Sequence, residues 1–293
     1  MIQEMETISG VTKLRNDIYI VYKSQFAPNV VRVYEDRNPF RLQKEIEINE
    51  IRFPWDIGSS HVENCLYIVG LSDVIGDICC VWKITRATGD QCKIIKLLST
   101  DYESKTLSVS SDGELLMINE SSHSLMIYGS DAELIRSIKL PSHIYQPLRA
   151  IETSIGNFII IHNKNSFSGD DELMELLGLE TGNRRLVVVS ELSRDGKMVI
   201  RSSNTSDARQ KLLDPTYLTL DSDNRVFVAV NGIHTAVVLL ESNLKLNRYV
   251  CPVKRGRQEI MIGKACGLCY DEEIKQLIVG SNFAVSFYTL SRY

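Results

Sequence analysis

The amino-acid sequence predicts an all-β fold, a six-bladed β-propeller with four-stranded antiparallel blades. Three observations lead to it: a strand pattern that recurs about six times, turn residues at matching places in the copies, and little helical periodicity. Repeated four-stranded sheets close economically into a ring, because a ring leaves only short, protected edges. We expect the N-terminal residues 2–8 to add the outer strand that the last blade lacks, which would close the ring.

The repeat is clearest where residues 106–141 align without a gap on residues 217–252, so that Asp112 meets Asp223. Four further copies lie around residues 10–21, 54–69, 147–161 and 268–279. Six copies in 293 residues give a period of roughly 49 residues, the length of four short strands and their turns. We assign one domain with blades at roughly residues 8–48, 50–98, 104–141, 143–204, 212–252, and 262–293 plus 1–7.

Within each copy we expect the strands to follow one another in the same order. The first alternates apolar and polar residues, as at Leu107 and Val109, and turn residues such as Asp112-Gly113 follow it. Because these residues tolerate positive φ, we expect two-residue hairpins there. The second strand, as in residues 115–118, is uniformly apolar, which is typical of a sheet buried on both faces. A third strand and a mixed fourth strand complete the copy, as in residues 125–128 and 134–140.

Composition excludes several classes of protein. Lys plus Arg number 33 and Asp plus Glu 37, so the formal charge is −4, which argues against a DNA-binding protein. No apolar run approaches the ~20 residues of a membrane span, and the N-terminus lacks a secretory pattern. We therefore expect a cytoplasmic protein with reduced cysteines. The C-x-x-C pair, Cys266 and Cys269, should point to opposite faces of a strand as small apolar side chains.

Two of the copies, residues 107–141 and 217–252, resemble NHL repeats, which form six-bladed propellers in tripartite-motif proteins. Asp112-Gly113 and the run from Asp221 to Val228 match the first half of that repeat. The second half departs from it, since Asn119 stands where Asp is usual. The resemblance implies a propeller related to the substrate-recognition domains of ubiquitin ligases. RING and B-box arrays are missing from this sequence, so it does not resemble the ligase itself.

The longest break in the pattern, residues 163–185, predicts an insertion on one face of the ring. Within it Asp170 could cap a short helix whose first turn is acidic. One interpretation is a helix packed back on the propeller. The other is an exposed apolar face that awaits a partner protein, formed by Leu173, Met174, Leu176 and Leu177.

Basic residues recur in loops that we expect on the same face as this insertion. They are Arg184, Arg185, Arg209, Lys211, Lys254, Arg255 and Arg257. Such a sector suits single-stranded RNA, which needs cations for its phosphates and aromatic side chains for stacking. Acidic neighbours dilute these charges and aromatic residues are sparse near the loops. A solvated surface of mixed charge and a protein-binding surface are the other interpretations.

Enzyme signatures are missing from the sequence. It has five His, but no His-x-His, G-x-S-x-G or glycine-rich phosphate loop. We assign no catalytic, metal-ligating or cofactor-binding residue. The leading hypothesis is a non-enzymatic scaffold that presents loops to a protein partner, with a role in substrate recognition in a ubiquitin-related pathway. The alternatives are an RNA-binding propeller and a metal-dependent propeller hydrolase or lyase.

Overall fold

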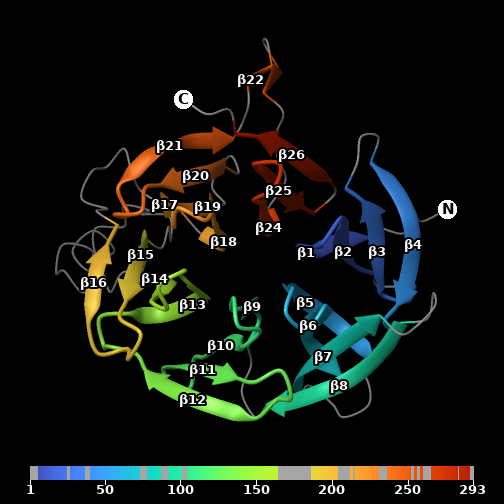
Figure 1. Cartoon of the computed structure of the whole chain (residues 1–293), viewed down its shortest axis with the longest axis horizontal. Helices are drawn as coiled ribbons and strands as arrows, with labels where there is room; N and C mark the ends of the chain where they lie inside the picture. The colour runs from blue at the N-terminus through green and yellow to red at the C-terminus, as the bar shows by residue number, and fades with distance from the viewer. Residues whose placement is uncertain are drawn as a thin grey trace, which may run out of the picture.

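A computed structural model describes residues 6–24, 27–36, 40–72, 78–86, 92–100, 104–163, 186–203, 212–213, 215–230, 236–251, 254–255, 258–259, 265–282 and 284–290. Within these ranges six antiparallel sheets stand around a central axis as blades, and no helix is formed (Figure 1). The predicted six-bladed propeller is confirmed. The same ranges contain no helix of the length and apolar character that crossing a bilayer requires.

The strands of each blade lie side by side in chain order, from the innermost strand at the central axis to the outermost strand at the rim of the propeller (Figure 1). The innermost strands are β1 (Thr7–Leu14), β5 (Ile51–Ser60), β9 (Leu107–Val109), β13 (Tyr145–Glu152), β18 (Pro215–Leu220) and β24 (Ala265–Asp271). The second strands are β2 (Asp17–Lys23), β6 (Cys65–Ser72), β10 (Leu115–Asn119), β14 (Phe158–Asn163), β19 (Val226–Val230) and β25 (Gln276–Ser281).

The outer half of each blade is less regular. The third strands are β3 (Val30–Glu35), β7 (Cys79–Arg86), β11 (Ser124–Tyr128), β15 (Leu186–Leu192), β20 (Ala236–Leu240) and β26 (Val285–Thr289). The fourth strands are β4 (Arg41–Glu47), β8 (Cys92–Thr100), β12 (Leu134–Lys139), β16 (Val199–Ser202) and β21 (Leu246–Cys251). A short strand, β17 (Leu212–Leu213), pairs with β15, and β22 (Lys254–Arg255) pairs with β23 (Gln258–Glu259) in a separate hairpin.

The second strands hold the core, as their uniform apolarity predicts. Every residue of β14 and of β19 is buried. Among the described residues, six clusters of buried apolar side chains fill the spaces between neighbouring blades. The cluster between the first and second blades contains Trp82, which has no exposed surface. Full burial of a large apolar side chain stabilises a fold by roughly 1.5–3 kcal/mol, so each blade depends on both its neighbours.

The turns after the inner strands contain left-handed residues, as predicted. The first blade has the expected two-residue hairpin, because Leu14 pairs with Asp17 and Arg15 has a positive φ. In the third, fourth and fifth blades the turn is one residue longer than expected. The Ser110 amide donates to the Glu114 carbonyl at 2.8 Å, and the Gly113 amide donates to the Ser110 carbonyl at 3.1 Å. These two bonds enclose a three-residue loop that ends on a left-handed residue. The same pair of bonds recurs in the fourth and fifth blades at Thr153 and Asp221. The left-handed residues are Gly113, Gly156 and Asn224.

The ring closes by packing β1 of the first blade against β24 and β25 of the sixth. A Cβ on Gly267 would lie only 2.6 Å from the amide nitrogen of Val11, so this approach requires glycine. The Ile8 amide donates a hydrogen bond to the Asn282 carbonyl at 3.1 Å. Backbone contact and apolar packing therefore join the first and last blades.

The expected outer strand from residues 2–8 is wrong for the part of that segment which the structure describes. Thr7 and Ile8 belong to β1 and pair with Lys23 and Tyr22 of β2. Residues 2–5 lie outside the described residues, and the sixth sheet has three strands within them. The register of β1 shifts between Ile8 and Gly10. This bulge interrupts the alternation of side chains, which hid the true start of the strand.

Candidate functional site

A cavity of about 580 Å³ lies at the centre of the ring, and all six inner strands contribute to its wall. Its mouth is formed at the turns that follow these strands, because Arg15, Asn16, His61 and Glu273 line it. Apolar side chains of the inner strands, among them Ile57, form part of the wall. Protein pockets that hold small molecules have volumes of about 300–1,000 Å³, so the cavity is of a suitable size for one.

A buried ion pair crosses the cavity between the second and fourth blades. Arg149 on β13 donates from Nη1 to Asp56 Oδ2 on β5 at 2.5 Å, and both side chains are at least nine-tenths buried. Asp56 also accepts the backbone amides of Leu107 and Ile57, at 3.0 and 2.9 Å. Burial raises the pKa of the Asp56 carboxyl, and the Arg149 charge and these amides oppose that rise. Because each charge has a partner, the pair is nearly neutral to its surroundings.

Tyr217 on β18 extends this polar layer to the fifth blade. The Arg149 guanidinium lies over the Tyr217 ring, 4.9 Å from its centroid, and the phenol donates to the Ser9 carbonyl at 3.1 Å. Ser9 precedes the lining residues of β1, so this layer forms the floor of the cavity. Burial raises the pKa of Tyr217 well above its ordinary value. The phenol therefore keeps its proton and acts as a donor.

Two buried polar atoms on lining residues have no hydrogen-bond partner in the part of the chain that the structure describes. They are Arg149 Nε and Ser108 Oγ. Arg149 is 7% exposed and Ser108 is 6% exposed, so water reaches neither side chain freely. A buried donor without a partner costs about 1–3 kcal/mol. Both atoms can donate, but they have almost no exposed surface of their own, so they lie behind the cavity wall.

The mouth contains a second network of charges. Lys13 on β1 is ion-paired with Asp271 on β24 and, at 2.7 Å, with Asp36. Burial alone would lower the pKa of the Lys13 ammonium, but its hydrogen bonds to Asp271 and Asp36 raise it instead. Lys13 therefore stays charged and links the first blade to the sixth across the point where the ring closes.

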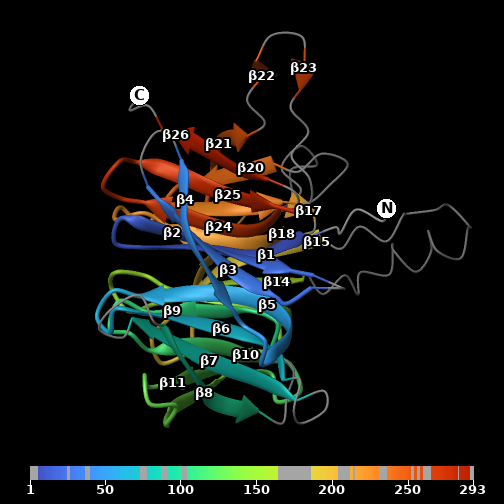
Figure 2. The same cartoon turned by 90° about the vertical axis from the view of Figure 1, so that its right-hand side faces the viewer.

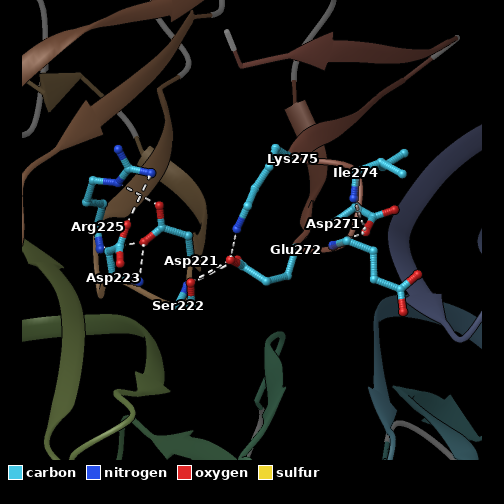
Figure 3. A network of polar contacts seen from close by, with 9 residues as sticks. Asp221, Ser222, Asp223, Arg225, Asp271, Glu272, Ile274 and Lys275 are labelled. Carbon is cyan, nitrogen blue, oxygen red and sulfur yellow. Dashed lines mark hydrogen bonds and ion pairs between the residues drawn. The ribbon is translucent and has the colours of Figure 1, made fainter. Parts of the chain in front are cut away.

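Neighbouring turns at the mouth are also joined directly (Figure 3). Ser222, in the turn of the fifth blade, donates from Oγ to Glu272 Oε1 at 2.5 Å, and Glu272 is ion-paired with Lys275 in the sixth blade. One blade earlier, the Ser154 amide donates to Asn224 Oδ1 at 3.0 Å. These bonds hold the mouth of the cavity in one arrangement, which favours a preformed site.

Glu152, at the end of β13, is the lining carboxylate that these networks leave out. Its carboxylate makes no hydrogen bond or ion pair with any residue in the described ranges, and its side chain is partly buried. Burial raises the pKa of the Glu152 carboxyl, the charges of Glu114 and Asp112 raise it further, and the charges of Arg194 and Arg136 oppose that rise. Such a carboxyl can attract a cation or exchange a proton with a bound molecule.

Most of the residues predicted as binding residues lie outside the described residues. This holds for the four apolar residues predicted in the insertion and for Arg184, Arg185, Arg209, Lys211 and Arg257. Lys254 and Arg255 form β22, and the β22–β23 hairpin projects beyond β21 and β26 at the rim (Figures 1 and 2). Their grouping into one basic surface stays a prediction.

Cysteine and histidine side chains follow the expectations in part. Cys266 and Cys269 both pack against the cluster that joins the sixth blade to the first. The expected opposite orientation is wrong, because the register of β24 shifts between Ala265 and Gly267. Burial raises the pKa of Cys269 to about 11, so its thiol is protonated at neutral pH. His123 occupies a turn with φ of 53°.

Sequence reasoning missed Asp56, Arg149 and Ser108. Each lies on an inner strand, and the two charged residues are 93 positions apart in the chain. The available signal was a single charge inside an apolar strand, as in Trp55-Asp56-Ile57 and Leu148-Arg149-Ala150. A buried charge needs a partner, so two such charges on inner strands could have been paired.

Comparison with known proteins finds similar structures but no related sequence. No family model matches the chain, and no curated protein matches it. Hydrazine synthase from Kuenenia stuttgartiensis matches over 97% of this chain and 96% of that chain, with a TM-score of 0.67 and 12% identity. A virginiamycin B lyase from Staphylococcus aureus matches over 99% and 89%, with a TM-score of 0.55 and 11% identity.

A structural genomics protein of unknown function from Bacteroides thetaiotaomicron matches over 99% of this chain and 70% of that chain, with a TM-score of 0.64 and 12% identity. At such identities the likeness shows the propeller fold alone. The propeller that the NHL resemblance implies is confirmed. The NHL repeat itself stays a prediction, since no family model supports it.

The prediction that the chain is not an enzyme is wrong. Hydrazine synthase and virginiamycin B lyase are enzymes, and both have chains with this fold. A propeller brings side chains from six separate strands to one cavity, so its chemistry leaves no motif of fixed spacing in the sequence. The lack of such motifs was therefore no basis for excluding catalysis.

Proposed function

We propose that this protein binds a small polar molecule in the central cavity of its propeller. The observation that carries the proposal is the cavity itself, which has a volume of about 580 Å³, is lined by all six inner strands and includes charged side chains among its lining residues. The networks of polar contacts at the mouth of the cavity keep the site preformed, which lowers the entropy cost of binding.

A cavity-blocking variant tests this proposal. Val109 lines the cavity and is partly exposed, so Val109→Trp would fill the space. Val62, which is 65% exposed on the turn after β5, supplies the matched control Val62→Trp. A library of neutral, cationic and anionic fragments is screened against all three proteins by saturation-transfer NMR, and circular dichroism confirms that each is folded.

We expect a set of fragments to bind the wild type and Val62→Trp and to lose binding to Val109→Trp. Equal binding to all three proteins would place the fragments elsewhere and would contradict the proposal. An absence of binding to the folded wild type would also contradict it.

We propose protein recognition at the rim as a second function, because apolar side chains stand exposed on two neighbouring blades. Ile135 on β12 is 55% exposed and Met198, just before β16, is 61% exposed. Arg136 of β12 donates to the Arg194 carbonyl at 3.0 Å, so the two edges lie together. Exposed apolar side chains that gather in one place are typical of interaction surfaces.

Substrate recognition in a ubiquitin-related pathway is the form of this second function that the NHL resemblance suggests, with a cytoplasmic location. A pull-down with mass spectrometry compares the wild type with Ile135→Asp and with a deletion of residues 166–183. Loss of the same partners from Ile135→Asp supports the rim surface, and loss from the deletion supports the insertion. Partner sets identical to that of the wild type would contradict both.

The RNA alternative has its own test. Affinity for single-stranded RNA is measured at two salt concentrations with the wild type and with a triple alanine variant of Lys254, Arg255 and Arg257. A site that neutralises phosphates weakens steeply with salt and weakens again in the variant. Affinity that is independent of salt, or unchanged in the variant, would reject RNA as the ligand of these residues.

A further inference from the structure

A thiol and an amine from neighbouring blades lie in contact on the outer strands of the propeller. Lys44 is on β4 of the first blade, Cys92 begins β8 of the second, and Lys44 Nζ donates to Cys92 Sγ at 3.6 Å. Both side chains are partly exposed. The two residues are 48 positions apart in the chain, so it is the folded ring that brings them together.

Strand alternation places the two groups in the same space. Lys44 and Ile46 share one face of β4, and Cys92 and Ile94 share one face of β8. Ile46, Cys92 and Ile94 pack against the apolar cluster between the first and second blades. The amine and the thiol therefore lie at the outer edge of that cluster, where the two blades meet the solvent.

A small cleft lies beside this pair. Its volume is about 10 Å³, and Lys44 and Cys92 line it together with Tyr19 and Asn64. This is about the space that one water-sized molecule occupies. Hydrogen peroxide is close to that size, whereas a larger thiol or disulfide is not. The cleft therefore gives a peroxide access to the sulfur at the point where the amine also lies.

Cys92 has different surroundings from the more deeply buried cysteines. Cys65 lines the same cleft, but it is 1% exposed and packs into the cluster between the second and third blades. Burial raises the pKa of the Cys65 thiol, and it raises that of Cys269 to about 11. The thiolate is the form that reacts with peroxide, and a neighbouring ammonium stabilises a thiolate. Cys92 is therefore better placed to react than Cys65 or Cys269.

The chemistry needs one hydrogen peroxide molecule. The Cys92 sulfur attacks a peroxide oxygen, so that an S–O bond forms, the O–O bond breaks, and hydroxide leaves as water with the thiol proton. The free amine of Lys44 then attacks the sulfur of this sulfenic acid. An S–N bond forms, the S–O bond breaks, and the hydroxyl leaves as water with an amine proton. One thiol, one amine and one peroxide thus give a sulfenamide and two waters, and the peroxide accepts two electrons from the sulfur.

We propose that hydrogen peroxide joins Cys92 Sγ to Lys44 Nζ in a sulfenamide, which links the outer strands of the first and second blades covalently. The bond is reversible, because a thiol reductant attacks the sulfur and releases the amine. This modification site is separate from the central cavity, since neither residue lines it.

Peptide mapping of the full chain tests the inference. The folded protein is treated with hydrogen peroxide and digested with trypsin in the absence of reductant. Trypsin does not cleave at a linked Lys44, so the product joins residues 42–52 to residues 87–93. Its mass should be about 2 Da below the sum of the two peptides, because the reaction removes two hydrogen atoms. A thiol reductant should release both peptides.

Variants separate this bond from other oxidation. Lys44→Met and Cys92→Ser should abolish the product, and circular dichroism confirms that both variants are folded. The control Lys93→Met removes an exposed ammonium from the opposite face of β8 and should keep the product, which now contains residues 87–96. Treatment of the wild type in urea should also abolish the product, because the unfolded chain does not hold the two residues together.

The inference is overturned if Cys92 stays reduced in the treated protein, or if it becomes a sulfinic acid without a link to Lys44. A disulfide between Cys92 and Cys65 would overturn it too, as would a product that persists in Lys44→Met or forms equally well in urea. None of these results affects the proposed function, which is tested by fragment binding in the central cavity.

Discussion

Removal of the Lys13 ammonium tests how the ring is closed. Lys13 is 8% exposed and lies between two carboxylates, Asp271 at 2% exposure and Asp36. The variant Lys13→Met keeps much of the side-chain volume but leaves both carboxylates without their cation. Breaking a buried ion pair in this way costs about 3–5 kcal/mol. For a chain of this size that loss lowers Tm by roughly 6–10 °C.

The pH dependence gives this prediction a definite sign. Burial alone would raise the pKa of Asp271, but hydrogen bonds from Lys13 and Asp36 outweigh it and hold the pKa below its ordinary value. Asp271 therefore adds stability above its unfolded pKa, and this stability is lost as pH falls through the lowered folded value. Without Lys13, the two buried carboxylates repel each other and their folded pKa values rise above the unfolded ones. Acid then stabilises the variant instead.

The assay is thermal unfolding between pH 7 and pH 4, followed by the fluorescence of the two tryptophans, of which Trp82 is fully buried. We expect the gap in Tm between wild type and Lys13→Met to be widest at pH 7 and to narrow toward pH 4. The control Lys197→Met removes an ammonium that is 85% exposed and 3.8 Å from Asp195, and it should leave Tm unchanged. The reasoning is refuted if Lys13→Met lowers Tm no more than Lys197→Met does, or if the loss of Tm in Lys13→Met is the same at every pH.

Three further predictions concern single positions. Gly267→Ala should lower stability by about 1–3 kcal/mol in urea unfolding, because the new Cβ would meet the Val11 backbone at 2.6 Å; no change would mean that the closure is looser than described. Gly113→Ala, at φ +86°, should cost about 1 kcal/mol in the same assay, and a stabilised variant would contradict the left-handed turn. Burial raises the pKa of Glu152, which favours its protonated form when folded, so Glu152→Gln should raise Tm at pH 7 and have little effect at pH 4. A lower Tm at pH 7 would show that the carboxylate is stabilised where it lies.

The fold was predictable because its signals are local. The apolar run at Phe158–Asn163 has the composition of a strand buried on both faces, and it is buried throughout. Gly113 and Asn224 mark turns because few other residues tolerate positive φ. The length of those turns was not predictable from residue type, since it depends on which two backbone amides donate across the loop.

The cavity was not predictable, because its members come from different blades. Asp56 and Arg149 meet through the curvature of the ring, although each reads in the sequence as one charge within a strand. Bulges near Ile8 and Ala265 shift side chains from one face of a strand to the other, and a bulge has no reliable sequence signal. Runs of basic residues are visible in a sequence, which is why the basic loops were predicted as a binding site. A pair of charges from distant strands leaves no such run.

The most direct measurement of the central claim is methyl NMR of the protein titrated with a fragment that binds the wild type. Methyl groups of Ile57, Ile151 and Leu218 line the cavity, while those of Ile135 and Ile200 are exposed on the rim. Binding in the cavity should shift the first three and leave the rim resonances in place. Shifts confined to Ile135 and Ile200, or no shift at any of the five, would contradict the claim that the centre of the propeller is the binding site.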